Sequence, residues 1–387
     1  MNFSFRPEQL AIRDSIARLC ARFDAQYWLE ADRSGRFPDD FHRAIAASGW
    51  LGIAMPQEFG GAGLGITEAA LMMQQISQSG AGFSGASSVH MNIFALNPVV
   101  VHGTEQQKRR WLPRLIRGEE KACFAVTEPD AGLDTAKTKT AAQRDGDRYL
   151  MRGQKIWIST AQVAAKMLIL ARTSAADSAR PTDGLSLFYA DLDRRHVEVR
   201  AIEKMGRHAV DSNVLFIEGL PVPVDDRIGE EGKGFEYLLD GLNPERILIA
   251  AEAVGLGRAA LSRAVTYANE RVVFDRPIGR NQAIQHPLAR CWMELEAAEL
   301  MVYKAASLYD AGERCGAEAN AAKYLAAEAC FGACEQAMLT HGGMGYAKEY
   351  HIERFLREAM IPRLAPVSPQ LILSFIAEKV LGMPKSY

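Results

Sequence analysis

Hydrophobic residues recur every three or four positions through the first 118 residues, and this spacing is typical of amphipathic helices. The pattern predicts helices over residues 7–23, 39–48, 66–79 and 88–102. Pro98 is expected to break the last of these, because proline has no amide hydrogen to donate inside a helix. This part of the chain is therefore predicted to be a helical domain.

Thr104 is in position to cap a further helix. Gln107 follows three residues later, which is the spacing of a capping box, and Gly118 is a suitable end for that helix. The glycines of segment 56–65 (PQEFGGAGLG) do not match the G-x-G-x-x-G spacing, and no strand-helix unit surrounds them. We therefore expect a loop there rather than a dinucleotide-binding turn.

The hydrophobic spacing changes from about 3.6 to 2 after Gly118, as expected for half-buried strands. Strands are predicted over residues 147–159, 166–174, 185–193, 197–203 and 212–223. Gly, Asp, Pro and Ser separate these segments and no helical stretch intervenes, which favours a largely antiparallel β-domain that ends near Gly229.

Helical spacing returns after Gly234, in segments longer than the average globular helix. They cover residues 235–270, 282–312 and 316–341, and a last pair is expected after the GGMG sequence at 342–345. Gly255 and Gly257 are expected where helices approach closely. The predicted fold class is α+β, with an amino-terminal helical domain at 1–118, a middle β-domain at 119–229 and a carboxy-terminal helical bundle at 230–387.

The composition is ordinary for a soluble protein, with 48% hydrophobic and 24% charged residues and a formal charge of −2. This balance gives no reason to expect a nucleic-acid partner. The amino terminus lacks a charged leader followed by an apolar core, and no run of about eighteen apolar residues occurs, so we expect no membrane insertion and a cytoplasmic location. The six cysteines are dispersed without metal-ligand spacing, which favours neither a disulfide framework nor a metal site.

One stretch, residues 123–160, combines features suited to a planar polar ligand. It opens with CFAVTEPDAGLDT, in which an apolar run leads to Thr127 and a turn at 130–132, and it closes with KIWIST, in which Trp157 precedes Ser159. A large flat ring beside hydroxyl groups is what a flavin requires. From these residues alone the alternative stays open that the tryptophan is a core residue and that the hydroxyls end a strand.

Motifs spread over essentially the whole chain resemble those of the acyl-CoA dehydrogenase family. AVTEPDAGLD (125–134) resembles its flavin-binding signature, KIWIST (155–160) its tryptophan segment, ERVVFDRPIG (270–279) its inter-subunit arginine segment, and GGMGYAKEYHIERFLRE (342–358) its carboxy-terminal signature. The resemblance implies an FAD cofactor, α,β-dehydrogenation of an acyl-CoA thioester, an electron transfer flavoprotein as acceptor, and a homotetramer built as a dimer of dimers.

The resemblance also implies which residues contact FAD. They are Phe124, Val126, Thr127, Gly132, Trp157, Ser159, Arg271, Phe274, Gln282, Gly343, Ser368 and Gln370. Ser159 corresponds to the family's hydroxyl near flavin N5, the atom that receives the β-hydride, and Arg271 and Phe274 would reach the FAD of a neighbouring subunit. Taken singly, Arg271 could be a solvated cation at a helix end and Gln282 a helix cap.

The catalytic base is expected at an unusual place. Most of the family supplies a glutamate after the carboxy-terminal signature, where this chain has Pro366. A subset similar to isovaleryl-CoA dehydrogenase places the base before an arginine on a long helix, and this position is Glu245, followed by Arg246. We therefore predict that Glu245 takes the α-proton; the alternative is a solvated glutamate in the first turn after Pro244. The predicted substrate contacts are Arg246, His90 and Asn92.

Pro366 raises a second question, because the family also uses the backbone N–H at that position to polarise the thioester oxygen, and proline has none. The Val367 amide could replace it, the site could use one donor, or the chemistry could differ. Leu133 and Leu339 also replace polar residues of the family motifs. A desulfinase, a flavin-dependent monooxygenase and an inactive flavin-binding paralogue therefore remain as alternatives.

Overall fold

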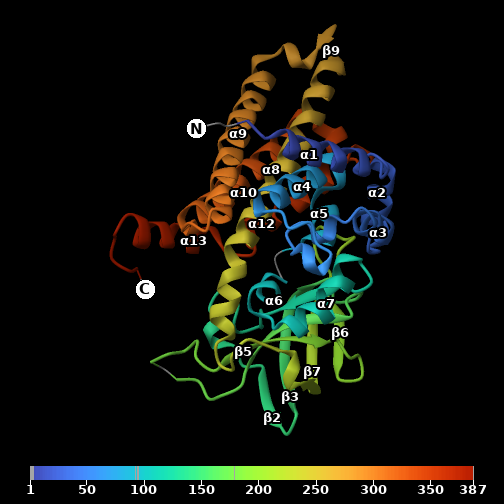
Figure 1. The fold of residues 1–387 in the computed structure, drawn as a ribbon. Helices are drawn as coiled ribbons and strands as arrows, with labels where there is room; N and C mark the ends of the chain where they lie inside the picture. Colours follow the sequence, from blue (N-terminus) through green and yellow to red (C-terminus); the bar gives the residue numbers. More distant parts are fainter. Residues whose placement is uncertain (1–3, 92, 94–95, 178, 387) are drawn as a thin grey trace.

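The structure is a computed structural model that describes residues 4–91, 93, 96–177 and 179–386. Helices from both ends of the sequence pack together, and a β-domain lies at the other end of the molecule (Figure 1). This order of helices, sheet and helices confirms the predicted α+β fold class.

Seven α-helices lie in the described amino-terminal part: α1 (Pro7–Cys20), α2 (Ala25–Ser34), α3 (Asp39–Ala47), α4 (Ile66–Ile76), α5 (Gly82–His90), α6 (Asn97–His102) and α7 (Glu105–Ile116). The predicted capping box is present, since the Thr104 side chain and Gln107 satisfy each other's backbone amides. The break expected near Pro98 in the stretch 88–102 is present, since α5 ends at His90 and α6 begins at Asn97. Pro98 lies in the first turn of a new helix, where its missing amide hydrogen is tolerated.

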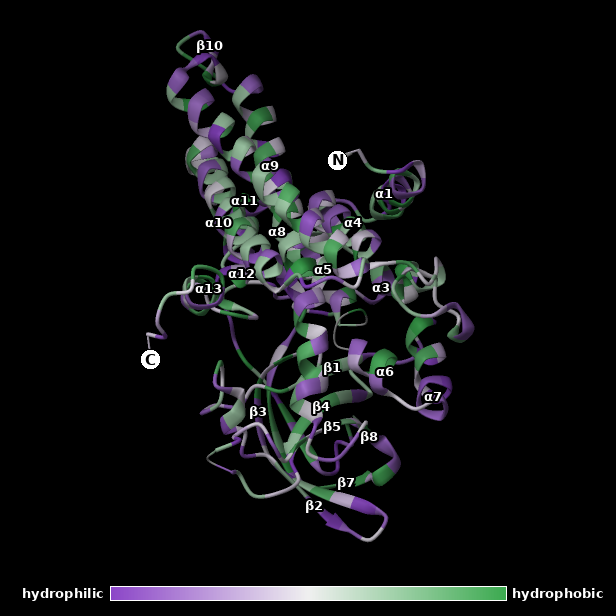
Figure 2. Ribbon diagram, turned by 60° about the vertical axis from the view of Figure 1, so that its left-hand side comes forward, coloured by the Kyte–Doolittle hydropathy of each residue, from purple (hydrophilic) through white to green (hydrophobic). Residues whose placement is uncertain are grey.

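The middle part is an eight-stranded sheet: β1 (Ala122–Ala125), β2 (Ala141–Asp145), β3 (Arg148–Ser159), β4 (Lys166–Arg172), β5 (Leu185–Asp191), β6 (Val197–Ala201), β7 (Ser212–Pro223) and β8 (Arg227–Ile228). The order is β6-β7-β3-β2-β4-β5-β8, and β1 pairs with β4. Most pairs are antiparallel as predicted, but β1 and β2 run parallel to β4. In Figure 2 β4 and β5 are mainly hydrophobic and β2 is hydrophilic, in agreement with their burial.

The carboxy-terminal part contains three long helices, α8 (Gly234–Glu270), α9 (Gln282–Asp310) and α10 (Gly316–His341). A small hairpin of β9 (Val272–Val273) and β10 (Arg276–Pro277) joins α8 to α9. After α10 the chain forms α11 (Ile352–Glu358), α12 (Ile361–Leu364), α13 (Pro369–Phe375) and a last helical turn (Ile376–Val380). These are more segments than the predicted pair.

Two glycines allow α8 to contact both neighbouring layers closely. A Cβ at Gly255 would lie 2.3 Å from the carbonyl oxygen of Gln74 on α4, which confirms the close helix approach expected there. A Cβ at Gly234 would lie 2.3 Å from the backbone nitrogen of Leu187 on β5. The amino-terminal end of α8 is therefore seated directly on the sheet, and its later turns lie against the amino-terminal helices.

The stretch Ile352–Val380 is long and apolar enough to cross a bilayer when judged by length and composition alone. The structure divides it into α11, α12, α13 and the last turn, with prolines at 362, 366 and 369 at or next to the breaks. It is therefore not one continuous helix.

Candidate active site

Glu245 is buried on α8 and faces a histidine. Its side chain is 8% exposed, and its Oε1 lies 3.8 Å from Nε2 of His90 on α5. Its Oε2 is buried without a hydrogen-bond partner among the described residues. The alternative of a solvated glutamate after Pro244 is therefore wrong, because the packing of α5 against α8 removes this carboxylate from water.

A second carboxylate holds the other side of the same imidazole. Glu252 on α8 is 1% exposed, and its Oε1 pairs with Nδ1 of His90. Burial alone would lower the pKa of His90, but the carboxylates of Glu252 and Glu245 outweigh it and raise that pKa to about 9. At neutral pH His90 is therefore an imidazolium between two carboxylates.

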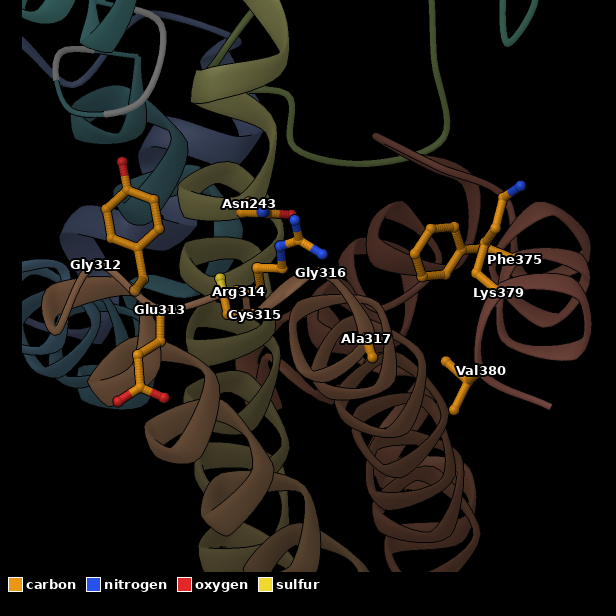
Figure 3. Close-up of a pocket in the computed structure, with 11 residues that line it drawn as sticks. Asn243, Gly312, Glu313, Arg314, Cys315, Gly316, Ala317, Phe375, Lys379 and Val380 are labelled. Atoms are coloured by element: carbon orange, nitrogen blue, oxygen red, sulfur yellow. The ribbon is translucent and has the colours of Figure 1, made fainter. Parts of the chain in front are cut away.

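Arg246 and Asn243 lead from this cluster to an open cleft. Arg246 Nη1 donates to Oδ1 of Asn243 at 3.2 Å, and Asn243 lines a cavity of about 760 Å³. The turn between α9 and α10 forms one wall and the last helical turn forms the other (Figure 3). Arg314 and Lys379 bring positive charge to its rim and Glu313 brings a carboxylate, and Lys379 is paired with Glu378.

The turn of the predicted flavin signature is fixed by a buried ion pair. Lys155 is fully buried, and its Nζ donates to Oε1 of Glu128 at 2.9 Å and to the Val126 carbonyl at 3.0 Å. The Glu128 carboxylate also accepts the backbone amides of Lys139 and Thr140. Burial lowers the pKa of Lys155 to about 8, against the attraction of Glu128. This pair connects the strand ends that carry Thr127 and Trp157.

Trp157 and Ser159 present their side chains at the end of β3. Trp157 is 57% exposed and has a left-handed φ of 62°, whereas its neighbour Ile158 is 1% exposed. The Ser159 hydroxyl accepts a hydrogen bond of 2.8 Å from Arg207 Nη2. Arg207, also at positive φ, donates from Nη1 to Ser87 on α5 at 3.1 Å. Arg207 thus links the Ser159 hydroxyl predicted for the flavin site to the helix that carries His90.

The predicted FAD contacts fall into separate groups within one chain. Phe124, Val126, Thr127, Gly132, Trp157 and Ser159 belong to the β-domain. Arg271 and Phe274 lie at the β9–β10 hairpin with Gln282 beside it, at the far end of the bundle from the sheet (Figure 1), and Phe274 is 93% exposed. Gly343 follows α10. A single chain therefore does not bring the hairpin residues to the sheet.

Ser368 has a structural contact in the chain. Its hydroxyl accepts the Leu371 amide and caps α13. Gln370, two residues later, is exposed. The predicted substrate contact Asn92 lies outside the described residues. The two apolar replacements in the family motifs, Leu133 and Leu339, are 53% and 66% exposed.

The segment at Pro366 is held by a buried lysine. Lys323 on α10 is 1% exposed, and its Nζ donates to the Val367 carbonyl at 2.6 Å. Burial lowers the pKa of Lys323 to about 8, while the Glu245 carboxylate opposes this shift. No described residue accepts a hydrogen bond from the Val367 amide.

Sequence reasoning did not identify Glu252, Arg207, Glu128, Lys155 or Lys323 as parts of the site. Glu252 is seven residues after Glu245, which is two helical turns, so a shared face could have been inferred. The spacing of the other residues gives no comparable signal, because they reach the site through contacts between elements distant in the sequence.

Three family sequence profiles match consecutive parts of the chain. They describe the N-terminal domain of acyl-CoA dehydrogenase over residues 6–119, the middle domain over 123–220 and the C-terminal domain over 232–381. The chain belongs to the acyl-CoA dehydrogenase family. It is therefore an oxidoreductase, and its cofactor is FAD.

Individual relatives cover nearly the whole chain. Acyl-CoA dehydrogenase FadE12 of Mycobacterium tuberculosis is 37% identical over 98% of this chain and 97% of that protein. The caffeyl-CoA reductase–Etf complex subunit CarC of Acetobacterium woodii is 36% identical over 86% of this chain and 87% of that protein. The solved glutaryl-CoA dehydrogenase–glutaryl-CoA complex has a TM-score of 0.94 and is 30% identical, covering 100% of this chain and 98% of that one.

The residues of this acyl-CoA dehydrogenase family member fit FAD. The exposed ring of Trp157 offers a flat apolar surface, and the Ser159 hydroxyl beside it offers a hydrogen bond at the polar edge of a flavin. Gly132 has no atom near the place a Cβ would take, so its backbone is open to a ligand. These groups would hold the isoalloxazine between the β-domain and α5.

Proposed function

We propose that this protein catalyses the FAD-dependent α,β-dehydrogenation of an acyl-CoA thioester to the trans-2-enoyl-CoA, with Glu245 as the base. The observation that carries the proposal is the Glu245 carboxylate, which is buried against His90 and keeps Oε2 without a partner among the described residues. A base that takes an α-proton requires such a carboxylate in a site that excludes water. We further propose that the protein belongs to the relocated-base subset similar to isovaleryl-CoA dehydrogenase.

When bound, FAD supplies the acceptor for the β-hydride. The chain's own task is to bind and polarise the thioester and to remove the α-proton: the Cα–H bond breaks and an O–H bond forms at Glu245. Polarisation requires donors aimed at the thioester oxygen. We assign one of them to the Val367 amide, since no described residue accepts its hydrogen bond and Lys323 fixes the carbonyl of the same residue.

We assign the CoA portion of the substrate to the cleft beside Asn243. The cavity of about 760 Å³ is large enough for part of a nucleotide, and Arg314 and Lys379 at its rim suit phosphate groups (Figure 3). Asn243 is two residues before Glu245 on α8, and Arg246 bonds to it. A thioester anchored in this cleft would therefore direct its acyl group toward the base.

We also propose a homotetramer, an electron transfer flavoprotein as the electron acceptor, and a cytoplasmic location. The exposed hairpin side chains Arg271 and Phe274, which lie far from the sheet of their own chain, support contact with a neighbouring subunit's cofactor. The Etf-linked relative CarC supports the acceptor. The location rests on composition.

The alternatives have less support. An inactive paralogue would be favoured by a solvent-facing Glu245, and this carboxylate is buried. The buried Glu245 carboxylate, whose Oε2 has no partner among the described residues, suits proton abstraction and so favours dehydrogenation over a desulfinase or monooxygenase reaction. Since CarC is a subunit of a caffeyl-CoA reductase–Etf complex, we also consider the reverse direction, for which the same base would return the proton to Cα.

The test is anaerobic flavin bleaching by a panel of acyl-CoA thioesters, comparing the wild type with Glu245→Gln. We expect at least one thioester to bleach the wild type and the variant to lose at least 1000-fold in rate while it keeps its FAD absorbance. Equal rates would refute Glu245 as the base. Absence of bleaching with every thioester in the wild type would favour the other chemistries.

A further inference from the structure

We propose that His90 and Glu252 are positioning residues for the base, and that Glu252 holds the His90 imidazole against Glu245 as a cation that keeps the base ionised in its buried site. This inference rests on the proposed role of Glu245. It gives His90 a different role from the direct substrate contact expected from the sequence.

The geometry is a short buried chain of three ionisable side chains. Glu245 and Glu252 are seven residues apart on α8 and therefore lie on the same face of the helix, two turns apart. His90, the last residue of α5, lies between them, with Nδ1 paired to Glu252 and Nε2 3.8 Å from Glu245. The side chains of the two glutamates and the histidine are each at most 8% exposed, so water does not replace these contacts.

Further charged groups face this cluster from the surrounding elements. Arg246 on α8 and Lys323 on α10 act on Glu245. Arg207, in the loop after β6, interacts electrostatically with Glu252 and with Glu358 on α11. Several cationic side chains therefore surround Glu245. Among the described residues, His90 is the one that lies within ion-pair distance of it, at 3.8 Å.

Electrostatics explains why the pair of Glu252 and His90 assists proton abstraction by Glu245. Burial disfavours a charged carboxylate, and a nearby cation favours it. Glu252 has the same effect on the imidazolium, whose pKa is raised to about 9. When Glu245 accepts the α-proton it becomes neutral, and the remaining charges of His90 and Glu252 still form a pair. Proton transfer thus leaves no unpaired buried charge in this cluster.

The test is the pH dependence of anaerobic flavin bleaching in Glu252→Gln and in the double variant His90→Gln/Glu252→Gln. In the single variant His90 loses its proton more readily, and in the double variant the cation is absent without leaving Glu252 as an unpaired charge. In both, the pH at which the rate reaches half its plateau should rise by about one unit or more. Asp226→Asn, in the turn between β7 and β8, removes a buried carboxylate that pairs with Arg110 on α7, and it should leave this pH unchanged.

A binding measurement separates positioning from substrate contact. The affinity for a CoA thioether, which lacks the acidic α-proton, should stay within twofold of wild type in both variants, while bleaching below the midpoint pH slows at least tenfold. Wild-type pH profiles in both variants, or affinity that falls in proportion to the rate, would overturn the role of His90 and Glu252. If Glu245→Gln bleaches normally, the proposed function itself fails and the positioning role fails with it.

Discussion

Lys323 on α10 donates a hydrogen bond of 2.6 Å to the carbonyl of Val367, in the segment where most of the family carries its base. The lysine is buried and does not form an ion pair within 4 Å among the described residues. The Lys323 ammonium group therefore binds a backbone carbonyl. We infer that this hydrogen bond fixes the orientation of the Val367 amide.

The first prediction concerns this bond. Lys323→Met should slow anaerobic bleaching by about 10- to 100-fold, because removing an oxyanion donor costs roughly 10²- to 10³-fold and this change only displaces one. It should also lower the free energy of unfolding by about 1–3 kcal/mol, because the Val367 carbonyl loses its buried partner. The measurements are stopped-flow absorbance and urea unfolding. Lys348→Met, at an exposed lysine, is the control; equal bleaching rates in the two variants would exclude this role of Lys323.

Arg207 leads to a prediction about the cofactor's reduction potential. Its guanidinium is one hydrogen bond from the Ser159 hydroxyl, and no carboxylate lies within 4 Å among the described residues. A cation there should favour the reduced flavin. Arg207→Met should therefore lower the midpoint potential by about 30 mV, a tenfold change for two electrons. A dye-linked redox titration measures this, with exposed Arg200→Met as control, and an unchanged potential would place Arg207 outside the flavin's electrostatic environment.

His42 is expected to make stability depend on pH. It is 1% exposed, and burial, with a smaller contribution from Lys121, lowers its pKa from 6.5 to about 4. The unfolded chain therefore binds this proton more readily, so stability is full above pH 6.5 and is lost as the pH falls toward 4. The loss is at most about 3.5 kcal/mol, since the shift is about 2.5 pKa units and each unit corresponds to about 1.4 kcal/mol.

Chemical unfolding of wild type and His42→Phe at pH 7 and pH 4.5 tests this effect. The variant should lose less stability than the wild type between the two pH values. His286→Gln, which changes an exposed histidine, should behave as the wild type. The same loss in all three proteins would assign the acid sensitivity to other groups.

The hairpin gives a prediction about assembly. Arg271→Gln and Phe274→Ala should weaken FAD binding at least tenfold without changing the oligomer, because both side chains are exposed at the tip and distant from their own sheet. Light scattering after gel filtration and FAD titration measure the two properties. Arg276→Gln, on the same hairpin, is the control. A wild-type monomer that binds FAD as tightly as an assembly does would refute the inter-subunit site.

The sequence predicted the long elements best. The helices α8, α9 and α10 and the strand β7 start and end within two residues of their predicted bounds, because each has many turns or alternations with one consistent period. By contrast, β1 has four residues, three of them fully buried, and thus no alternation to detect. Short elements such as α2 depend on packing that a local pattern does not contain.

The same distinction between local sequence pattern and packing applies to the residues of the site. Glu245 was proposed from the motif that its neighbour Arg246 and the surrounding helix form, whereas its contact with His90 results from how α5 packs on α8. Arg207 was missed because its direction depends on a backbone φ of 56°, which no spacing of side chains indicates. Motifs thus gave the proposed site residues, and the fold supplied their electrostatic partners.

The length of α8 has a mechanical consequence. About 26 residues separate Glu245 from Arg271 at the end of the helix, which corresponds to about 40 Å at 1.5 Å per residue. One helix thus carries the proposed proton acceptor near one end and, in the proposed tetramer, a support for another subunit's cofactor at the other. A tilt of α8 during turnover in one subunit would therefore move residues that support the cofactor of the neighbouring subunit. The active sites of the assembly would then be mechanically coupled.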